Sequence, residues 1–138
     1  MDRLMGLDVG DRTIGVAVSD LLMITAQGVT TIRRTNLKND INELKKIIEE
    51  YNVTKIVAGL PKMLDNSVGI QGEKVLAFLE KLKKHVDLPI ELEDERFTTS
   101  ISEKMLIQAD VKRKKRKEVI DKLAAVQILT SYMQRTNK

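Results

Sequence analysis

Residues 5–20 read Met-Gly-Leu-Asp-Val-Gly-Asp-Arg-Thr-Ile-Gly-Val-Ala-Val-Ser-Asp and decide the fold that this sequence predicts. Apolar residues up to Val9 predict a first strand, and Gly10-Asp11-Arg12 is typical of a turn, with a glycine free to adopt positive φ. From Thr13 onward, β-branched residues alternate with smaller or polar ones, which is the period of two of a second strand. The segment therefore predicts a β-hairpin.

Asp8 breaks the pattern of the first predicted strand. Carboxylates are depleted in strands and are costly to bury without a partner. A metal ion, a nearby cation or a helix N-terminus would each stabilise Asp8 at the end of a central strand. The alternative is a structural role, in which Asp8 caps the turn by accepting a hydrogen bond from the amide of Gly10 or Asp11.

The composition is that of a globular chain with one core. With 138 residues, of which 42% are hydrophobic and 32% charged, the sequence predicts a single domain spanning residues 1–138. The chain has no cysteine, which excludes disulfides, cysteine-ligated zinc and cysteine nucleophiles. The first residues lack the apolar core of a signal peptide, and no apolar run reaches membrane-spanning length. We therefore expect a cytoplasmic protein that does not associate with a membrane.

Downstream of the hairpin, the pattern alternates between strands and helices. Strands are predicted at Gly28–Arg34, Val53–Ala58 and Pro89–Glu93, and helices at about Ile41–Tyr51, Val75–Val86, Ser100–Ala109 and Glu118–Gln134. The first of these helices has Asn36 or Asn39 as its N-cap, and Ser100 with Glu103 forms a capping box. This order predicts an α/β fold in which a mixed five-stranded sheet has helices on both faces.

Two further carboxylates stand out. Glu95 follows the last predicted strand, and Asp121 lies on the otherwise apolar face of the last predicted helix, where favourable interaction with the helix dipole is the alternative role. Ligands of open α/β sheets bind beyond the carboxyl ends of the strands. Carboxylates gathered there would repel one another without cations between them, and hard oxygen ligands suit Mg²⁺ or Mn²⁺. Two such ions about 4 Å apart activate water for phosphodiester hydrolysis.

The positive charge of the chain is concentrated in one segment. The net charge is +4, and six of the 24 Lys and Arg stand together as Lys112, Arg113, Lys114, Lys115, Arg116 and Lys117. The other 18 are outnumbered by 20 Asp and Glu. A basic segment so close to Asp121 predicts contact with a nucleic-acid backbone, with a solvated loop as the alternative. Arg12 either contacts a phosphate or is a solvated turn residue.

Several motifs together resemble the YqgF/RuvX family of resolvase-like nucleases, within the RNase H-like superfamily. The resemblance covers nearly the whole chain and rests on Gly6-Leu7-Asp8-Val9-Gly10, Ile14-Gly15-Val16-Ala17-Val18-Ser19-Asp20, Gly59-Leu60-Pro61, Asp94-Glu95-Arg96-Phe97-Thr98-Thr99, and Asp121 with Ala124-Ala125 and Ile128-Leu129. It implies an RNase H-like sheet of strand order 3-2-1-4-5 with an antiparallel second strand. In the loop after Gly59 the chain departs from the family, because Met63-Leu64 and Asn66-Ser67 stand where an Asn-Met and a Gly-Ser pair are expected.

The resemblance also implies an active site and an activity. Its catalytic acids and metal ligands fall on Asp8, Glu95 and Asp121, with Mg²⁺ or Mn²⁺ as the cofactor, in a cytoplasmic bacterial protein. The implied function is 5′-end processing of the 16S ribosomal RNA precursor, with the ribosome as a partner, and resolution of Holliday junctions is implied by analogy. Met63 lacks the amide of the expected Asn, which removes a polar contact to the substrate and leaves the acids unaffected.

Three functions are compatible with these residues. A metal-dependent nuclease uses all three acids, whereas a non-catalytic ribosome-assembly factor needs only the basic segment. An ATP-dependent phosphotransferase is the third, because residues 8–13 also resemble the phosphate loop of the actin and sugar-kinase superfamily, although those enzymes use two such lobes and 138 residues supply one. The sequence leaves open whether the substrate is RNA or branched DNA, and whether the protein is a monomer or a homodimer.

Overall fold

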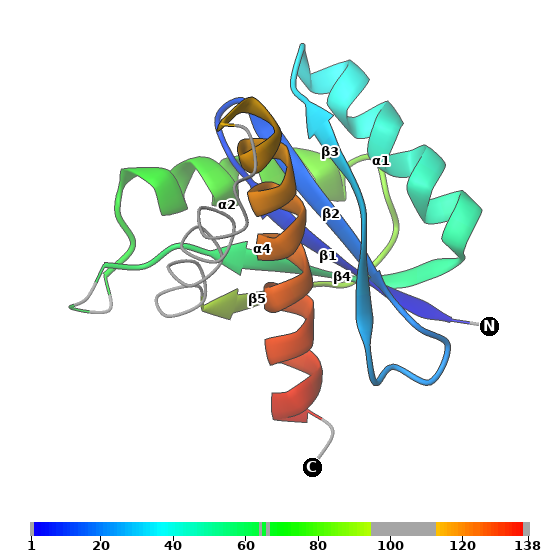
Figure 1. Cartoon of the computed structure of the whole chain (residues 1–138). Coiled ribbons are helices and arrows are strands. Elements are labelled where there is room, and N and C mark those ends of the chain that lie inside the picture. The colour runs from blue at the N-terminus through cyan, green and yellow to red at the C-terminus, as the bar shows by residue number, and fades with distance from the viewer. Residues whose placement is uncertain (1, 64, 66, 95–112, 137–138) are drawn as a thin grey trace.

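The computed structural model describes residues 2–63, 65, 67–94 and 113–136, without the side chains of residues 113–119 and 121. Its elements are β1 (Arg3–Val9), β2 (Thr13–Ser19), β3 (Ala26–Arg33), α1 (Leu37–Tyr51), β4 (Val53–Leu60), α2 (Ile70–Lys83), β5 (Ile90–Asp94) and α4 (Arg113–Thr136) (Figure 1). Within these residues the predicted alternation of strands and helices is confirmed. The helix predicted at Ser100–Ala109 lies outside the described residues.

The five strands form one mixed sheet in the order β3-β2-β1-β4-β5. β2 runs antiparallel to β1 and β3, whereas β4 runs parallel to β1 and β5. This is the expected strand order, with β1 at the centre and the second strand antiparallel. The carboxyl ends of β1, β4 and β5 therefore lie along one edge of the sheet, which we call the carboxyl edge.

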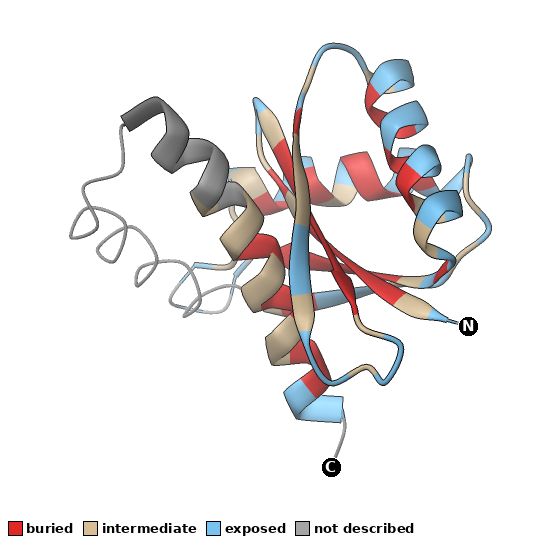
Figure 2. Cartoon of the chain, turned by 45° about the vertical axis from the view of Figure 1, so that its right-hand side comes forward, coloured by how far each residue is buried: buried red, intermediate tan, exposed pale blue. Residues whose placement is uncertain are grey.

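Helices cover both faces of the sheet, as predicted. α1 and α2 pack on one face and α4 crosses the other (Figure 1). Along β1 the side chains alternate between two buried clusters: Met5, Leu7 and Val9 lie under α1 and α2, whereas Leu4 lies under α4. Figure 2 shows the buried residues on the central strands and on the inward sides of the helices. The strand period thus divides the sheet between two cores.

Two strands are longer than predicted. β3 begins two residues earlier, at Ala26, because its pairing with β2 continues as far as Ser19. β4 ends two residues later, at Leu60, because its pairing with β5 continues to Asp94. In both cases cross-strand hydrogen bonding extends a strand through residues whose local pattern is weak.

The last helix also begins earlier than predicted. α4 begins at Arg113, not near Glu118, so that residues 113–117 of the basic segment are helical. Lys and Arg are good helix formers, and no Gly or Pro interrupts them. None of the helices in the described part of the chain is long and apolar enough to cross a membrane.

Two asparagines fix the ends of α1. Asn36, one of the two predicted N-caps, accepts a hydrogen bond from the amide of Asn39 at 2.9 Å. Asn52 adopts the left-handed conformation at the C-terminus, with φ of 54°, which Asn tolerates better than most residues. The N-terminal cap places the first turn of α1, including Asp40, directly after β3.

Candidate functional site

Asp8 lies at the carboxyl end of the central strand. It is the penultimate residue of β1, is paired with Gly15 of β2, and is half-buried. Because side chains alternate along a strand, Asp8 shares the face of Leu4 and Gly6, which is the face that α4 covers. The structure thus places Asp8 at the end of a central strand and at the carboxyl edge, as the sequence predicted.

α4 crosses the sheet at close range beside Asp8. A Cβ atom on Gly6 would lie 2.8 Å from the carbonyl oxygen of Ala125 and 3.0 Å from Cβ of Leu129. The helix can therefore approach the strand this closely only because residue 6 is a glycine. Asp121 lies in α4 one helical turn before Ala125, and its side chain lies outside the described residues.

Glu95 lies outside the described residues, but the strand that precedes it is described. β5 ends at Asp94, which is paired with Leu60 at the end of β4. Since β1, β4 and β5 are parallel, β5 leads the chain to the same carboxyl edge at which Asp8 lies. In the described part of the chain, no three His, Cys, Asp or Glu side chains are grouped to hold a metal ion. The meeting of Glu95 and Asp121 with Asp8 therefore stays a prediction.

The turn after β1 is closed by a main-chain contact. The amide of Gly10 donates to the carbonyl of Thr13 at 2.8 Å, and a Cβ atom on residue 10 would lie 3.1 Å from that oxygen. Gly10 permits this close approach without using its freedom to adopt a positive φ, which no described glycine does. Of the two amides that the structural alternative for Asp8 names, that of Gly10 donates to Thr13. Capping through the Asp11 amide stays a prediction.

A largely buried ion pair supports this turn. The Arg34 guanidinium donates from Nε to Asp40 Oδ2 at 3.1 Å and from Nη1 to the carbonyl of Gly10 at 2.7 Å. The main-chain amide of Arg34 donates to the carbonyl of Arg12 at 2.8 Å. The Asp40 side chain is 3% exposed and that of Arg34 is 25% exposed. The pair ties the β1–β2 turn to the end of β3 and to α1.

Sequence reasoning missed Arg34 and Asp40. The available signal was Asp40, which lies one turn before Leu44 on the otherwise apolar face of α1 and so predicts a buried carboxylate that needs a cation. The contact between Arg34 and Gly10 had no such signal, because it spans 24 residues and depends on the folded arrangement of the strands.

Cationic side chains flank the carboxyl edge. Arg12 is exposed on the β1–β2 turn, and Lys74 of α2 pairs with Asp11 of the same turn at 3.3 Å. In the predicted basic segment, residues 113–117 lie in the first turns of α4. Lys112 and the side chains of residues 113–117 lie outside the described residues. Contact of Arg12 and of the basic segment with nucleic acid therefore stays a prediction.

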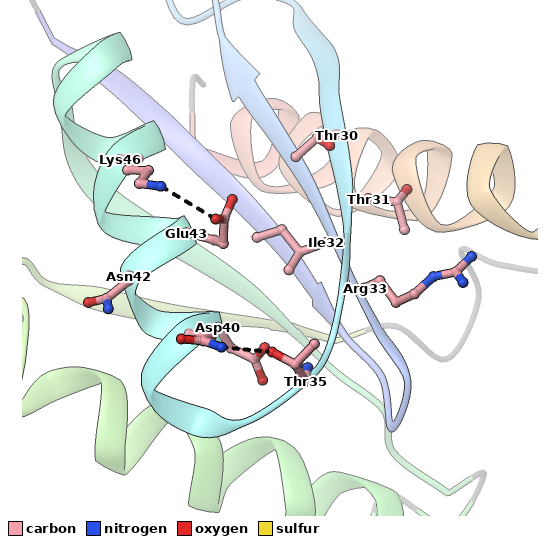
Figure 3. Close-up of a pocket in the computed structure, with 10 residues that line it drawn as sticks. Thr30, Thr31, Ile32, Arg33, Thr35, Asp40, Asn42, Glu43 and Lys46 are labelled. Atoms are coloured by element: carbon pink, nitrogen blue, oxygen red, sulfur yellow. Dashed lines mark hydrogen bonds and ion pairs between the residues drawn. The ribbon is translucent and has the colours of Figure 1, made fainter.

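A polar groove of about 660 Å³ opens between β3 and α1 (Figure 3). It is lined by residues 30–33 of β3 and by polar side chains of α1, among them Glu43 and Lys46, which pair at 3.6 Å. Asp40 lies at one end of the groove, where its Oδ1 accepts a hydrogen bond from the Thr35 amide at 3.2 Å. Asp8 does not line the groove, so the candidate site is the carboxyl edge around Asp8.

The geometry defines a class of protein. A mixed sheet of order 3-2-1-4-5, with an aspartate at the end of its central strand and helices on both faces, is the arrangement of an RNase H-like domain. The sequence model of the RuvX family, described as "Holliday junction resolvase", matches residues 2–135. The chain therefore belongs to the RuvX family, and the resemblance seen in the sequence is confirmed.

Individual relatives agree with this assignment. A protein of Desulforamulus reducens named "Putative pre-16S rRNA nuclease" is 60% identical over 131 residues, which cover 95% of this chain and 96% of the relative. The fold is similar to that of the Fowlpox virus resolvase in complex with Holliday junction DNA, with a TM-score of 0.60 and 15% identity over 99% of each chain. It is also similar to T. thermophilus RuvC in complex with a Holliday junction substrate, with a TM-score of 0.57 and 10% identity over 100% of this chain and 98% of that one. These structures confirm the predicted fold.

Proposed function

We propose that the chain is a metal-dependent nuclease that hydrolyses phosphodiester bonds in nucleic acid, with residues 1–138 forming one domain. The observation that carries the proposal is the half-buried carboxylate of Asp8, at the carboxyl edge and on the face that α4 crosses. A strand position of this kind disfavours an acid, so its presence at the ligand-binding edge of an α/β sheet indicates a functional role. Membership of the RuvX family and the name of the 60% identical relative support the same activity.

The proposed metal ligands and catalytic acids are Asp8, Glu95 and Asp121. Their carboxylate oxygens are the hard donors that suit Mg²⁺ or Mn²⁺, and the placement of Asp8 fits such a site. A bound ion of this kind lowers the pKa of water and stabilises a leaving phosphate-ester oxygen. Two features of the described chain support this set. β5 ends one residue before Glu95, and α4, which carries Asp121, approaches the sheet closely at Gly6.

The proposed nucleic-acid contacts are Arg12 and the basic segment, residues 112–117. Arg12 is exposed four residues after Asp8, and a phosphate near the acids would lie within reach of its long side chain. Phe78 and Tyr132 are buried in the two cores, so they provide no surface on which bases could stack. We therefore expect binding to be dominated by phosphate contacts and to weaken steeply with salt.

The proposed substrate is the 16S ribosomal RNA precursor, because a relative sharing 60% of its residues carries that activity in its name. The ribosome or its precursor particle would then be the partner. A Holliday junction is the second candidate, favoured by the description of the family and by the fold shared with two resolvases. Resolution requires two matched cuts, so this alternative calls for a homodimer, whereas processing of an RNA end needs only a monomer.

Cleavage assays on a panel of labelled substrates test the proposal. The panel contains a 5′-extended 16S precursor fragment, single-stranded DNA and a four-way junction, each with Mg²⁺, Mn²⁺ or chelator. We expect metal-dependent cleavage of the precursor, and a loss of at least about 100-fold in Asp8→Asn, Glu95→Gln and Asp121→Asn.

Two other results have different meanings. Cleavage of the junction alone, by a dimer, would select the second candidate. Binding of RNA without any cleavage, equal in wild type and Asp8→Asn, would contradict a nuclease and indicate a non-catalytic assembly factor.

A matched pair of double substitutions tests the nucleic-acid contacts. Lys114→Gln with Lys115→Gln removes two adjacent cations from the basic segment, and Lys45→Gln with Lys46→Gln removes two adjacent exposed cations from α1. The first pair should reduce the dependence of log affinity on log salt by about 1 per lysine that contacts a phosphate. The second pair should leave it unchanged. An equal effect of the two pairs would contradict a localised contact.

A further inference from the structure

We propose that Arg34, paired with Asp40, is a positioning residue that fixes the turn following Asp8 and thereby holds the geometry of the metal site. The inference rests on the proposed function and adds two residues to it. Its starting point is the end of β1, because the strand stops at Val9, one residue after Asp8. Beyond that residue the chain is held by the contacts of the turn itself.

Arg34 makes two contacts with the turn. Its guanidinium donates to the carbonyl of Gly10 at 2.7 Å, which is the short distance typical of hydrogen bonds from charged donors. Its own amide donates to the carbonyl of Arg12 at 2.8 Å. Together with the bond from the Gly10 amide to Thr13, these contacts hold both ends of the turn that begins two residues after Asp8.

The guanidinium is itself held from two further elements. Asp40 in the first turn of α1 accepts from Nε at 3.1 Å, and its other oxygen accepts from the Thr35 amide, so its orientation is fixed on both sides. The ring of Phe78 in α2 lies 5.0 Å from the guanidinium carbon, within the range of a cation–π contact. Arg34 therefore joins the turn to β3, α1 and α2.

The other ion pair at this turn is a weaker tether. Lys74 of α2 contacts Asp11 at 3.3 Å, but the two side chains are 56% and 59% exposed. Exposed pairs contribute little, typically about 0–1 kcal/mol, and are screened by salt. The Asp40 side chain is 3% exposed, so the Arg34–Asp40 pair is shielded from water and its geometry is better defined. Arg34 is therefore the principal restraint that the described residues place on the turn.

A rigid turn matters because metal ligands tolerate little displacement. Site geometry must hold to within about 0.5 Å, and loss of a group that orients a ligand typically costs about 10- to 100-fold in metal affinity or activity. Lysine cannot replace Arg34, since one ammonium group lacks the planar fork that contacts Asp40 and Gly10 at the same time. Arg34→Lys keeps the positive charge beside Asp40 and so removes the fork alone.

Arg3 provides a matched control at the opposite end of β1. Its guanidinium also donates to a main-chain carbonyl, that of Tyr51 at 3.3 Å, and it lies 5.8 Å from the ring of the same residue. Arg3→Lys therefore makes the same chemical change, in the same kind of contact, away from Asp8. A general effect of losing an arginine fork would appear in both variants.

Titration calorimetry with Mn²⁺ alone, on the full chain without nucleic acid, tests the inference. We expect Mn²⁺ binding to be lost in Asp8→Asn, weakened about 10- to 100-fold in Arg34→Lys, and unchanged in Arg3→Lys. The Mn²⁺ concentration for half-maximal cleavage should rise by the same factor in Arg34→Lys, while the rate recovers at saturating Mn²⁺. A merely structural role would lower the free energy of unfolding without this shift.

A second variant keeps the inference testable if Arg34→Lys does not fold. Arg34→Met combined with Asp40→Leu removes both charges, so that neither is left buried alone, and it should show the same weakening. Wild-type Mn²⁺ affinity in both Arg34 variants, with binding that still requires Asp8, would overturn the inference and leave the proposed function standing. Absence of Mn²⁺ binding that depends on Asp8 in the wild type would overturn both.

Discussion

The two faces of the sheet differ in the size of the side chains that the same strands present to them. Toward α1 and α2 the strands present large, buried aliphatic side chains: Met5, Leu7, Val9, Ile14, Val16, Val18, Ile56 and Leu60. Toward α4 the intervening positions near the carboxyl edge are small, namely Gly6, Gly15, Ala17 and Gly59, with Val57 as the larger exception. At the carboxyl edge itself, Val9 faces the first side and Asp8 faces the second.

Because of this difference, one face of the sheet contributes most to stability and the other carries the proposed active site. Each large side chain buried under α1 and α2 contributes about 1.5–3 kcal/mol. The small residues under α4 contribute less, but they let the helix approach to the point where Gly6 leaves no room for a Cβ atom beside Ala125. We expect a helix so close to the sheet to bring the turn that contains Asp121 toward Asp8. The α1 and α2 face therefore stabilises the sheet, while the α4 face is shaped around the candidate site.

The largest effect on folding is expected on the α1 and α2 face. Leu44 of α1 is fully buried in that cluster, so Leu44→Ala should lower the free energy of unfolding by about 2–5 kcal/mol through lost burial and a cavity. Urea unfolding measures this change. Cleavage per folded molecule should stay at the wild-type level. A stability loss below about 1 kcal/mol would contradict the division between the two faces.

On the α4 face we expect a smaller loss of stability, accompanied by a loss of activity. Gly6→Ala forces its new Cβ atom against a main-chain oxygen at 2.8 Å, so α4 must shift, at a cost of about 1–3 kcal/mol. Gly28→Ala is the control, because its Cβ atom would lie 3.4 Å from the Lys122 side chain, an ordinary contact. Cleavage per folded molecule should fall in Gly6→Ala and not in Gly28→Ala. Equal activity in the two variants would show that the position of α4 does not matter.

The smallest loss of stability is expected near the C-terminus of α4. The Tyr132 hydroxyl donates to Glu91 and accepts from Lys55 at 3.2 Å, so Tyr132→Phe should lower the free energy of unfolding by about 1 kcal/mol at pH 7. Burial, with the bond to Glu91, raises the pKa of Tyr132 above its usual value. The hydroxyl therefore stabilises the fold below the ordinary tyrosine pKa, about 10, and this contribution is lost as pH rises through the folded-state pKa.

Urea unfolding of wild type and Tyr132→Phe at pH 7 and at pH 11 measures this loss. Tyr51→Phe corrects for the general effect of alkali on the chain. The difference between wild type and Tyr132→Phe should shrink at the higher pH. A difference that persists undiminished would contradict a stabilising role for the protonated hydroxyl.

Local patterns were sufficient to predict the architecture and one site residue. The period of two in residues 13–19 predicted the hairpin, helical spacing predicted α1 and α2, and the resemblance implied the strand order that the structure has. Asp8 was found because it violates a strand rule within its own segment. The start of α4 was predicted too late, because residues 112–117 lack the apolar periodicity of a helix although Lys and Arg have a high helix propensity.

The remaining features depend on contacts between distant segments. In the sequence, Gly6 is only a residue of low strand propensity. Its packing against Ala125 depends on how the helix lies on the sheet. The contact between Arg34 and Gly10 likewise requires β3 to return beside the β1–β2 turn. Sequence periodicity assigns a residue to a face of its own element, but it does not identify the atoms opposite that face.

The most direct measurement compares wild type and Asp8→Asn in two assays on the same preparation: Mn²⁺-dependent cleavage of the 16S precursor fragment, and urea unfolding. If Asp8 serves catalysis and not folding, cleavage falls at least about 100-fold while the free energy of unfolding changes by less than about 1 kcal/mol. Cleavage at the wild-type rate by folded Asp8→Asn would contradict the assignment of the carboxyl edge as the active site.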